Sequence, residues 1–128
     1  MKVLLDTHVF LWWNIDDPRL SKKARAVISN PGNTLILSVA SAWEIAIKVQ
    51  AGKLRLPSDA ATYVQDRAAH NYMEILPIQL KHAVELHSLP LHHRDPFDRI
   101  LIVQSLIEGL PIMTADQQFR SYAVDIVW

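Results

Sequence analysis

The sequence predicts a single α/β domain with a mostly parallel sheet, and three observations support this fold class. The chain has 128 residues, a length typical of one domain and sufficient to bury a core. Hydrophobic residues make up 50% of it and charged residues 20%, a balance that excludes intrinsic disorder. Short apolar runs alternate with helical stretches, and no linker or repeat interrupts them. Strands that alternate with helices are typical of a parallel sheet, so we expect one domain over residues 1–128.

The N-terminal half predicts two strands and three helices. A short apolar run between polar residues is typical of a buried strand. A serine before a helical stretch and a glycine or proline after it mark the ends of a helix. The elements expected here are a strand at Val3–Leu5, a helix that begins near Val9, a helix from the cap Ser21 to Pro31, a strand at Leu35–Leu37, and a helix capped by Ser38 or Ser41 that ends at Gly52.

The C-terminal half continues the same alternation with three helices and three strands. An acid at the cap followed by proline at the first helical position is a common helix start. The elements expected here are a helix from the cap Ser58 to about His70, a strand at Met73–Leu76, a helix at about Gln79–Leu89, a helix opened by Asp95 and Pro96 that ends at Gly109, and strands at Ile112–Thr114 and Val124–Val127.

Several classes of protein are excluded by composition. The chain has no cysteine, which excludes disulfide scaffolds, thiolate zinc sites and cysteine nucleophiles. Asp6 comes too early for a signal-peptide core, and no apolar run reaches the ~18 residues of a membrane helix, so we expect a cytoplasmic protein without a membrane partner. The formal net charge of zero argues against a protein that binds nucleic acid with its whole surface.

Five acids fall where the chain leaves a predicted strand or enters a helix. They are Asp6, Glu44, Asp95, Asp98 and Asp116. In an open parallel sheet these positions meet beyond the carboxyl ends of the strands, where ligands bind. Clustered carboxylates repel one another and their pKa values rise unless a cation neutralises them. Hard oxygen ligands without thiolates suit Mg²⁺ or Mn²⁺, and such sites act on phosphate esters.

Each acid also has a purely structural explanation, which the residues alone leave open. Ser41 and Glu44 fit a capping box, in which the glutamate reaches back to a backbone N–H. An acid in the first turn of a helix also gains from the helix dipole, as Asp98 would. The remaining acids fit helix caps, at Asp6, Asp95 and Asp116.

Four short motifs, in this order, strongly resemble those of a PIN domain, and within that family the VapC-type toxins of toxin–antitoxin modules. They are Leu4-Leu5-Asp6-Thr7-His8, Ser41-Ala42-Trp43-Glu44-Ile45, Asp95-Pro96-Phe97-Asp98-Arg99 and Thr114-Ala115-Asp116. The resemblance extends from Lys2 to Trp128 and implies one PIN domain, with a five-stranded parallel sheet in the order 3-2-1-4-5 between helices. It also implies an endoribonuclease that depends on Mg²⁺ or Mn²⁺ and is held in check by a cognate antitoxin.

The resemblance assigns the family's four catalytic acids to Asp6, Glu44, Asp98 and Asp116. We expect Asp6 and Asp98 to bind the metal directly, and Glu44 and Asp116 to bind it directly or through water. The family's third acid precedes an apolar helical run, as Asp98 does, so Asp95 is assigned to the helix cap. The expected chemistry is in-line attack of a water, activated by the metal, on an RNA phosphodiester.

Residues around these acids receive supporting roles. The hydroxyls of Thr7 and Thr114 are similar to those that flank the family's site, and together with Asp95 they are expected to support the metal ligands. If the five acids line the site, eight acids remain against 13 basic residues elsewhere. This excess favours phosphate contacts, with Arg94 and Arg99 as the expected RNA-binding residues. His92 and His93 directly precede Arg94 and are also expected to contact phosphate rather than metal.

The segment Val9–Trp13 predicts a protein interface. A helix buries a stripe of about 100°, so five consecutive apolar residues should leave Trp12 or Trp13 exposed in a monomer. The family supplies two partners for such a surface, the antitoxin and a second copy of the chain in a homodimer. Two alternatives to a toxin remain, a catalytically idle PIN-type binding or scaffold protein and a nuclease that processes RNA outside any toxin module.

Overall fold

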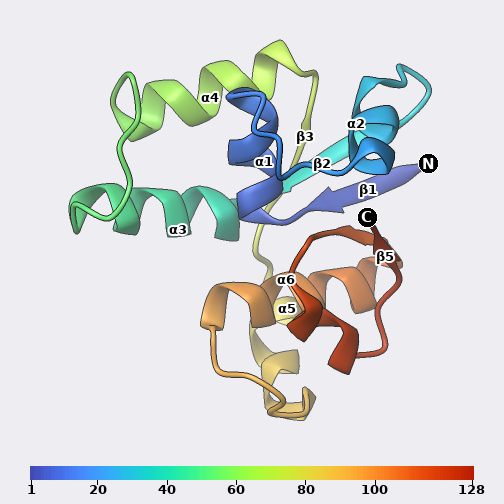
Figure 1. Cartoon of the computed structure of the whole chain (residues 1–128). Coiled ribbons are helices and arrows are strands. Elements are labelled where there is room, and N and C mark those ends of the chain that lie inside the picture. The colour runs from blue at the N-terminus through green and yellow to red at the C-terminus, as the bar shows by residue number, and fades with distance from the viewer.

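The computed structural model describes all 128 residues as one α/β domain with a five-stranded, fully parallel sheet. The sheet order is β3-β2-β1-β4-β5, which confirms the predicted order (Figure 1). The neighbouring strands β1 and β2 are the longest, and all of their residues except the first of each strand are buried. The strands are β1 (Lys2–Leu5), β2 (Thr34–Ser38), β3 (Glu74–Leu76), β4 (Ile112–Met113) and β5 (Ile126–Val127).

Helices connect all successive strands, as a parallel sheet requires. The six α-helices are α1 (Thr7–Asn14), α2 (Lys22–Ser29), α3 (Val39–Gln50), α4 (Ala60–His70), α5 (Leu80–Glu85) and α6 (Pro96–Glu108). Two short 3₁₀ segments, η1 (Leu86–Ser88) and η2 (Gln117–Ser121), follow α5 and β4. No helix combines the length and the apolar character needed to cross a bilayer.

The alternation of side chains along β1 separates the core into two layers. Val3 and Leu5 pack with residues of α1 and α2 on one face of the sheet. Leu4 points to the other face and packs with Leu101 of α6. A third cluster joins α1, β2, α3 and α4 through Phe10, Leu37, Ile45, Tyr63 and Ala68. These layers fix α1, α3 and α6 to the sheet at the positions where their first turns face the same edge.

Several element boundaries differ from the prediction. The first helix begins at Thr7 rather than near Val9, and the cap of α4 is Asp59 rather than Ser58, since the Asp59 side chain accepts a hydrogen bond from the Thr62 N–H. The expected helix at Gln79–Leu89 is shorter in α form and ends in the 3₁₀ turn η1. Three strands are also shorter than predicted.

The prediction that Trp12 or Trp13 is exposed in the monomer is wrong. The Trp12 ring packs on the Trp128 ring at 6.1 Å, and the Arg19 guanidinium lies 4.7 Å from its centroid. Trp13 donates a hydrogen bond from Nε1 to Asn71. Both rings are therefore half-buried within one chain. The exposed tryptophan is Trp43 in α3, with 53% of its surface accessible.

Candidate functional site

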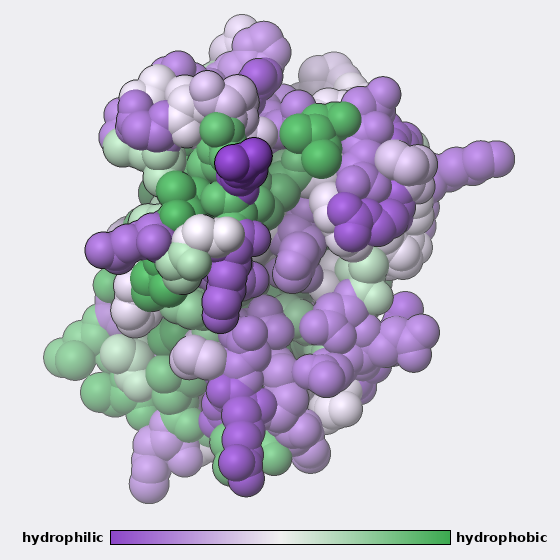
Figure 2. Space-filling view, turned by 60° about the vertical axis from the view of Figure 1, so that its left-hand side comes forward, coloured by the Kyte–Doolittle hydropathy of each residue, from purple (hydrophilic) through white to green (hydrophobic).

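The strands β1, β2 and β4 end at one edge of the sheet, and the predicted acids gather there. Asp6 follows β1 directly, Glu44 lies in the second turn of α3 after β2, and Thr114 and Asp116 follow β4. Asp98 lies in the first turn of α6. Figure 1 shows α3 and α6 beginning on the side toward which β1 points. Figure 2, with that side turned forward, shows hydrophilic side chains along the centre of the face and hydrophobic ones to the left and above.

The Asp6 carboxylate is buried and does not cap its helix. Asp6 is the residue before α1, yet its side chain makes no capping hydrogen bond and only 3% of the residue is exposed. Its Oδ2 instead accepts a hydrogen bond of 2.7 Å from Thr114 Oγ1. Burial raises the pKa of Asp6, and the charge of Glu44 adds to the rise, against the lowering effects of the Thr114 hydrogen bond and of His8. The capping explanation for Asp6 is therefore wrong.

Glu44 is likewise buried, with 3% of the residue exposed, and it does not form the capping box proposed with Ser41. The cap of α3 is Ser38, whose hydroxyl accepts from the Ala40 N–H, because the helix begins directly after β2. The Glu44 carboxylate accepts a hydrogen bond of 2.6 Å from Lys48 Nζ, one turn later. Burial lowers the pKa of Lys48, but the hydrogen bond to Glu44 and the charges of Glu44, Asp95 and Asp98 together raise it. Lys48 is thus the cation that balances Glu44 within the chain.

Thr7 joins the first turns of α1 and α3. Its hydroxyl donates a buried hydrogen bond of 2.9 Å to Ser41 Oγ. This contact fixes the two helices that carry the residues beside Asp6 and Glu44. The predicted role for Thr7 in supporting the acids is consistent with this position, although its hydrogen bond goes to Ser41 and not to a carboxylate.

Asp95 and Asp98 divide their tasks within one turn. Asp95 Oδ1 accepts from the N–H groups of Phe97 and Asp98, at 2.9 and 3.0 Å, and Pro96 occupies the first turn, which confirms the predicted cap. The Asp98 side chain does not cap the helix and is 14% exposed. The helix therefore begins on Asp95, while the Asp98 carboxylate faces the other acids.

The electrostatics of Asp98 are consistent with a shared edge for the acids. Burial, followed by the charges of Asp6, Asp95, Glu44 and Asp116, raises the pKa of Asp98 to about 8. Each of the other four predicted acids contributes to this rise. The sequence prediction that the five carboxylates share one edge is confirmed.

Asp116 lies at the rim of the cluster and has a structural role as well. Its side chain accepts from the Gln118 N–H and caps η2, which confirms the predicted cap. Its own N–H donates to Thr114 Oγ1 at 3.0 Å. Thr114 therefore links the exposed Asp116 to the buried Asp6 through a single hydroxyl.

The donor set fits a hard divalent ion that keeps most of its water. No three acidic or histidine side chains are close enough to form a complete ligand cage. Mg²⁺ is commonly bound by only one or two carboxylates, with water as the remaining ligands, so a complete cage is not required. When the carboxyls of Asp6, Glu44 and half-buried Asp98 are all ionised, their negative charge exceeds the single positive charge of Lys48. An additional cation at this edge would therefore lower the repulsion among the acids.

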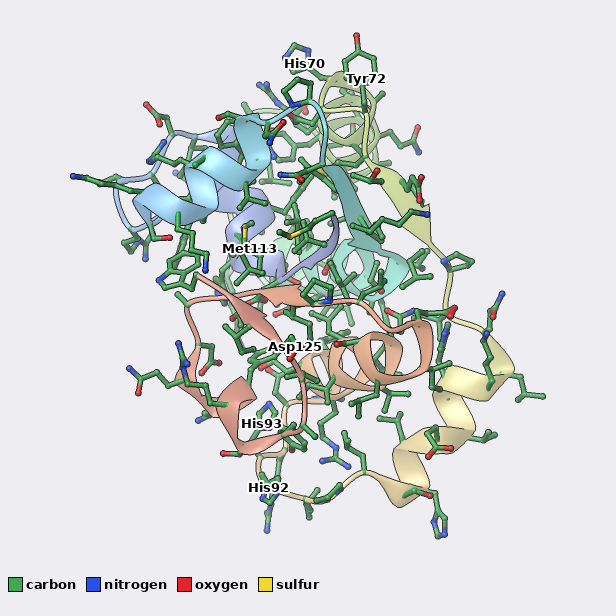
Figure 3. The ribbon with its side chains drawn as sticks, turned by 90° about the vertical axis from the view of Figure 1, so that its right-hand side faces the viewer. His70, Tyr72, His92, His93, Met113 and Asp125 are labelled. Atoms are coloured by element: carbon green, nitrogen blue, oxygen red, sulfur yellow. The ribbon has the colours of Figure 1, made fainter.

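The sequence analysis missed the position of His93. Its ring lies inside the loop before α6, with a side-chain exposure of 8%, and Nε2 is 3.4 Å from Asp98 Oδ2. Figure 3 shows His93 turned inward beside η2, whereas His92 lies at the outer end of the loop. No periodic signal marks a loop residue of this kind, because its surroundings come from Phe119 in η2 and from Tyr122, 29 residues later.

The two predicted RNA-binding arginines differ in their surroundings. The Arg99 guanidinium donates to the carbonyl oxygens of Leu89 and Pro90 and to Tyr122 Oη, so it holds the loop before α6. Arg94 is exposed in the same loop. The residues next to Glu44 and Asp98 form an aromatic pair, in which exposed Trp43 and half-buried Phe97 meet edge to face at 5.0 Å.

Thr114→Val is expected to weaken the site more than the fold. The substitution keeps the shape of the side chain but removes the hydroxyl that donates to Asp6 and accepts from Asp116. A lost buried hydrogen bond of this type destabilises a protein by about 1–3 kcal/mol. We expect roughly a tenfold or larger loss of Mn²⁺ affinity, measured by calorimetry, because partners that orient metal ligands matter by about 10–100-fold. Thr34→Val, at the start of β2, is the matched control and should leave Mn²⁺ affinity unchanged.

The fold and the site together define a parallel α/β domain with an acidic, divalent-metal type of centre at its carboxyl edge. Residues 3–125 match the family model of the PIN domain, so the chain belongs to the PIN-domain family. A curated relative, ribonuclease VapC22 of Mycobacterium tuberculosis, is 30% identical over 122 residues, which cover 94% of this chain and 91% of the relative.

Two solved structures share the fold at lower sequence identity. VapBC2 from Rickettsia felis, bound to a DNA fragment from its promoter, matches with a TM-score of 0.70 and 15% identity, over 98% of this chain and 97% of that one. VapBC-5 from Mycobacterium tuberculosis, a member of the VapBC family of toxin–antitoxin systems, matches with a TM-score of 0.62 and 20% identity, over 98% and 97% of the two chains. At these identities the matches establish the fold.

Proposed function

We propose that this chain is a metal-dependent endoribonuclease that acts as the toxin of a toxin–antitoxin pair. The observation that carries the proposal is the placement of five carboxylates where β1, β2 and β4 end and where α6 begins, at the ligand-binding edge of the sheet. Burial of Asp98, followed by the charges of the other four acids, raises its pKa to about 8. Such a cluster is unfavourable without a divalent cation, and divalent cations at carboxylate sites commonly act on phosphodiesters. The 30% identity to ribonuclease VapC22 supports RNA as the substrate.

Mg²⁺ or Mn²⁺ is the proposed cofactor. Asp6 and Asp98 would hold the ion directly, and Glu44 and Asp116 directly or through water. When bound, the ion supplies positive charge that lowers the pKa of an attacking water and stabilises the phosphodiester under attack. Thr114 holds Asp6 by its hydrogen bond, and Thr7 fixes the neighbouring helix starts.

The chain's own residues supply the contacts to RNA. Outside the five clustered acids, the chain has eight acids and 13 basic residues. The remaining surface therefore carries an excess of positive charge, which favours binding of a polyanion such as RNA. Arg94 is exposed in the loop before α6 and is the first choice for a phosphate contact. Arg99 already donates to two carbonyl groups of the same loop. Its proposed contribution to RNA binding is to hold the loop that carries Arg94 and to add positive charge.

The proposed partners are a cognate antitoxin and a second copy of the chain. VapBC-5, which shares the fold, belongs to a toxin–antitoxin family, and this supports an antitoxin partner here. Such a pair acts in the cytoplasm, where its RNA substrates are, and we assign residues 1–128 to one catalytic domain. The exposed surface around Trp43, rather than Trp12 or Trp13, is the more suitable place for a contact with another protein.

Purified protein is expected to cleave single-stranded or loop RNA with Mg²⁺ or Mn²⁺, and EDTA should abolish cleavage. The products should carry a 5′-phosphate and a 3′-hydroxyl, because water attacks rather than the ribose 2′-hydroxyl. Asp66→Asn, which removes an exposed acid of α4, is the matched control and should cleave like the wild type. Cleavage that persists in EDTA, or products with 2′,3′-cyclic phosphates, would contradict the metal-dependent route, and the absence of any cleavage would favour an idle scaffold protein.

Growth assays separate a toxin from a nuclease that processes RNA. Expression of the chain alone should arrest growth, and co-expression of a small neighbouring gene that encodes a DNA-binding protein should restore it. Cleavage in vitro without growth arrest would indicate the processing nuclease instead.

A further inference from the structure

The Tyr122 hydroxyl is the meeting point of four nitrogen atoms in the loop before α6. The backbone nitrogens of His92 and His93 each lie 3.2 Å from Tyr122 Oη, and Arg99 Nη1 lies at the same distance. The fourth atom is the ring Nδ1 of His93, at 3.0 Å. The Tyr122 side chain itself is anchored in the core beneath α6, so this oxygen has a fixed position.

The hydrogen count at this oxygen assigns a tautomer to His93. A tyrosine hydroxyl has two lone pairs and one hydrogen, whereas backbone N–H groups and guanidinium groups can only donate. Three donors already compete for these two lone pairs, so none is left for a fourth donor. The O–H hydrogen therefore goes to the one remaining neighbour, Nδ1 of His93, which must accept it. A neutral imidazole that accepts at Nδ1 carries its hydrogen on Nε2.

That Nε2–H group has one polar neighbour. Nε2 is buried and makes no regular hydrogen bond, and the nearest acceptor is Asp98 Oδ2 at 3.4 Å. A buried donor without a partner destabilises a fold by about 1–3 kcal/mol, so a slight movement of either group toward a hydrogen bond is favourable. The chain of contacts therefore runs from Tyr122 through His93 to Asp98.

We propose that His93 is a positioning residue, whose Nε2–H is directed by Tyr122 and orients the Asp98 carboxylate for a divalent ion. The proposal rests on the proposed function only in that Asp98 is taken as a metal ligand. Carboxylates that bind metals are commonly oriented by a hydrogen bond from a neighbouring group. Arg99 ties the same hydroxyl and the same loop to α6, so the loop, the imidazole and the first turn of α6 form one unit.

Two substitutions at His93 separate the two ends of the ring. Glutamine places its amide nitrogen near the former Nε2, so it keeps a donor to Asp98. Asparagine places its amide near the former Nδ1, so it keeps the contact with Tyr122 but has no donor to Asp98. We expect His93→Asn to weaken Mn²⁺ binding by roughly 10–100-fold and His93→Gln by less than about threefold, measured by calorimetry. A purely structural role in the loop would give the opposite order.

Tyr122→Phe provides a second and independent variant. It removes only the hydroxyl, so His93 loses the group that fixes its tautomer, and Mn²⁺ binding should weaken severalfold. Nitrogen NMR of the metal-free wild type should show the hydrogen of His93 on Nε2, and the Tyr122→Phe protein should show a mixture of tautomers. If His93→Asn fails to fold, the Mn²⁺ affinity and the tautomer of Tyr122→Phe test the proposal on their own.

The outcomes for the inference and for the proposed function are distinct. The positioning role would be overturned if His93→Asn bound Mn²⁺ as tightly as the wild type does. It would also be overturned if NMR showed the hydrogen of His93 on Nδ1 in the wild type. Both conclusions would hold even if the protein cleaves RNA. Tight Mn²⁺ binding that depends on His93 in a protein that cleaves no RNA would overturn the nuclease assignment and retain the positioning role. A wild type that binds no Mn²⁺ would overturn both.

Discussion

Asp98→Asn should abolish metal-dependent RNA cleavage, whereas Asp95→Asn should leave most of the activity intact. The amide introduced by Asp98→Asn keeps one oxygen ligand but loses the charge that holds a divalent ion. Because such an ion stabilises the transition state by several kcal/mol, the expected loss is about 100-fold or more. The amide oxygen introduced by Asp95→Asn would still accept from the N–H groups of Phe97 and Asp98, since asparagine caps helices about as well as aspartate.

Thermal melting separates this loss of function from a loss of fold. Without metal, Asp98→Asn should melt at the wild-type temperature or above it, because a repelling carboxyl has been removed from among four other acids. With Mn²⁺, the wild type and Asp95→Asn should gain stability and Asp98→Asn should gain little. An inactive Asp95→Asn beside an Asp98→Asn that cleaves like the wild type would reverse our assignment of the two acids.

Metal affinity should rise steeply between pH 6 and pH 8. The pKa of Asp98 is raised to about 8, so below that pH a proton must leave before the carboxylate can bind an ion. Affinity should increase nearly tenfold for each pH unit below the pKa, or about 50-fold from pH 6 to pH 8. Calorimetric titration of Mn²⁺ at pH 6, 7 and 8 measures this change, together with a proton released on binding.

The same shift predicts the opposite trend for the metal-free protein. The folded-state pKa of Asp98 lies above its ordinary value of 3.8, so the folded protein binds more protons than the unfolded chain between about pH 4 and pH 8. The contribution of this group to stability is therefore fully present below pH 4 and is lost as the pH rises through 8. Asp98→Asn should flatten this part of the melting profile. An Mn²⁺ affinity that stays constant from pH 6 to pH 8 would show that Asp98 is already ionised or is not a ligand.

The sheet and the place of the site were predictable because they depend on local patterns. The apolar runs of β1 and β2 lie between polar residues, and helices join them, so topology alone brings Asp6, Glu44, Asp98 and Asp116 to one edge. Whether a given acid caps a helix or belongs to the site could not be predicted from neighbouring residues. The Asp6 side chain does not cap α1 but accepts a hydrogen bond from the hydroxyl of Thr114, 108 residues later.

Two of the failures have their origin in distant contacts. The exposed surface expected at Trp12 is covered by Trp128 from the other end of the chain. His93 receives its partner from Tyr122, 29 residues later, and neither residue lies in a periodic segment. The capping box at Ser41 failed for a nearer reason, because α3 begins one turn earlier than that pattern requires.

The ion pair between Lys48 and Glu44 implies that metal uptake is an exchange of cations. In the metal-free chain the ammonium group of Lys48 already balances Glu44, and its charge also acts on Asp95 and Asp98. A divalent ion that enters must displace this group or share the carboxylates with it, and part of its binding free energy is used in doing so. The affinity for metal is thereby set below what the acids alone would provide, and Lys48 acts as a competitor of the ion that is built into the chain.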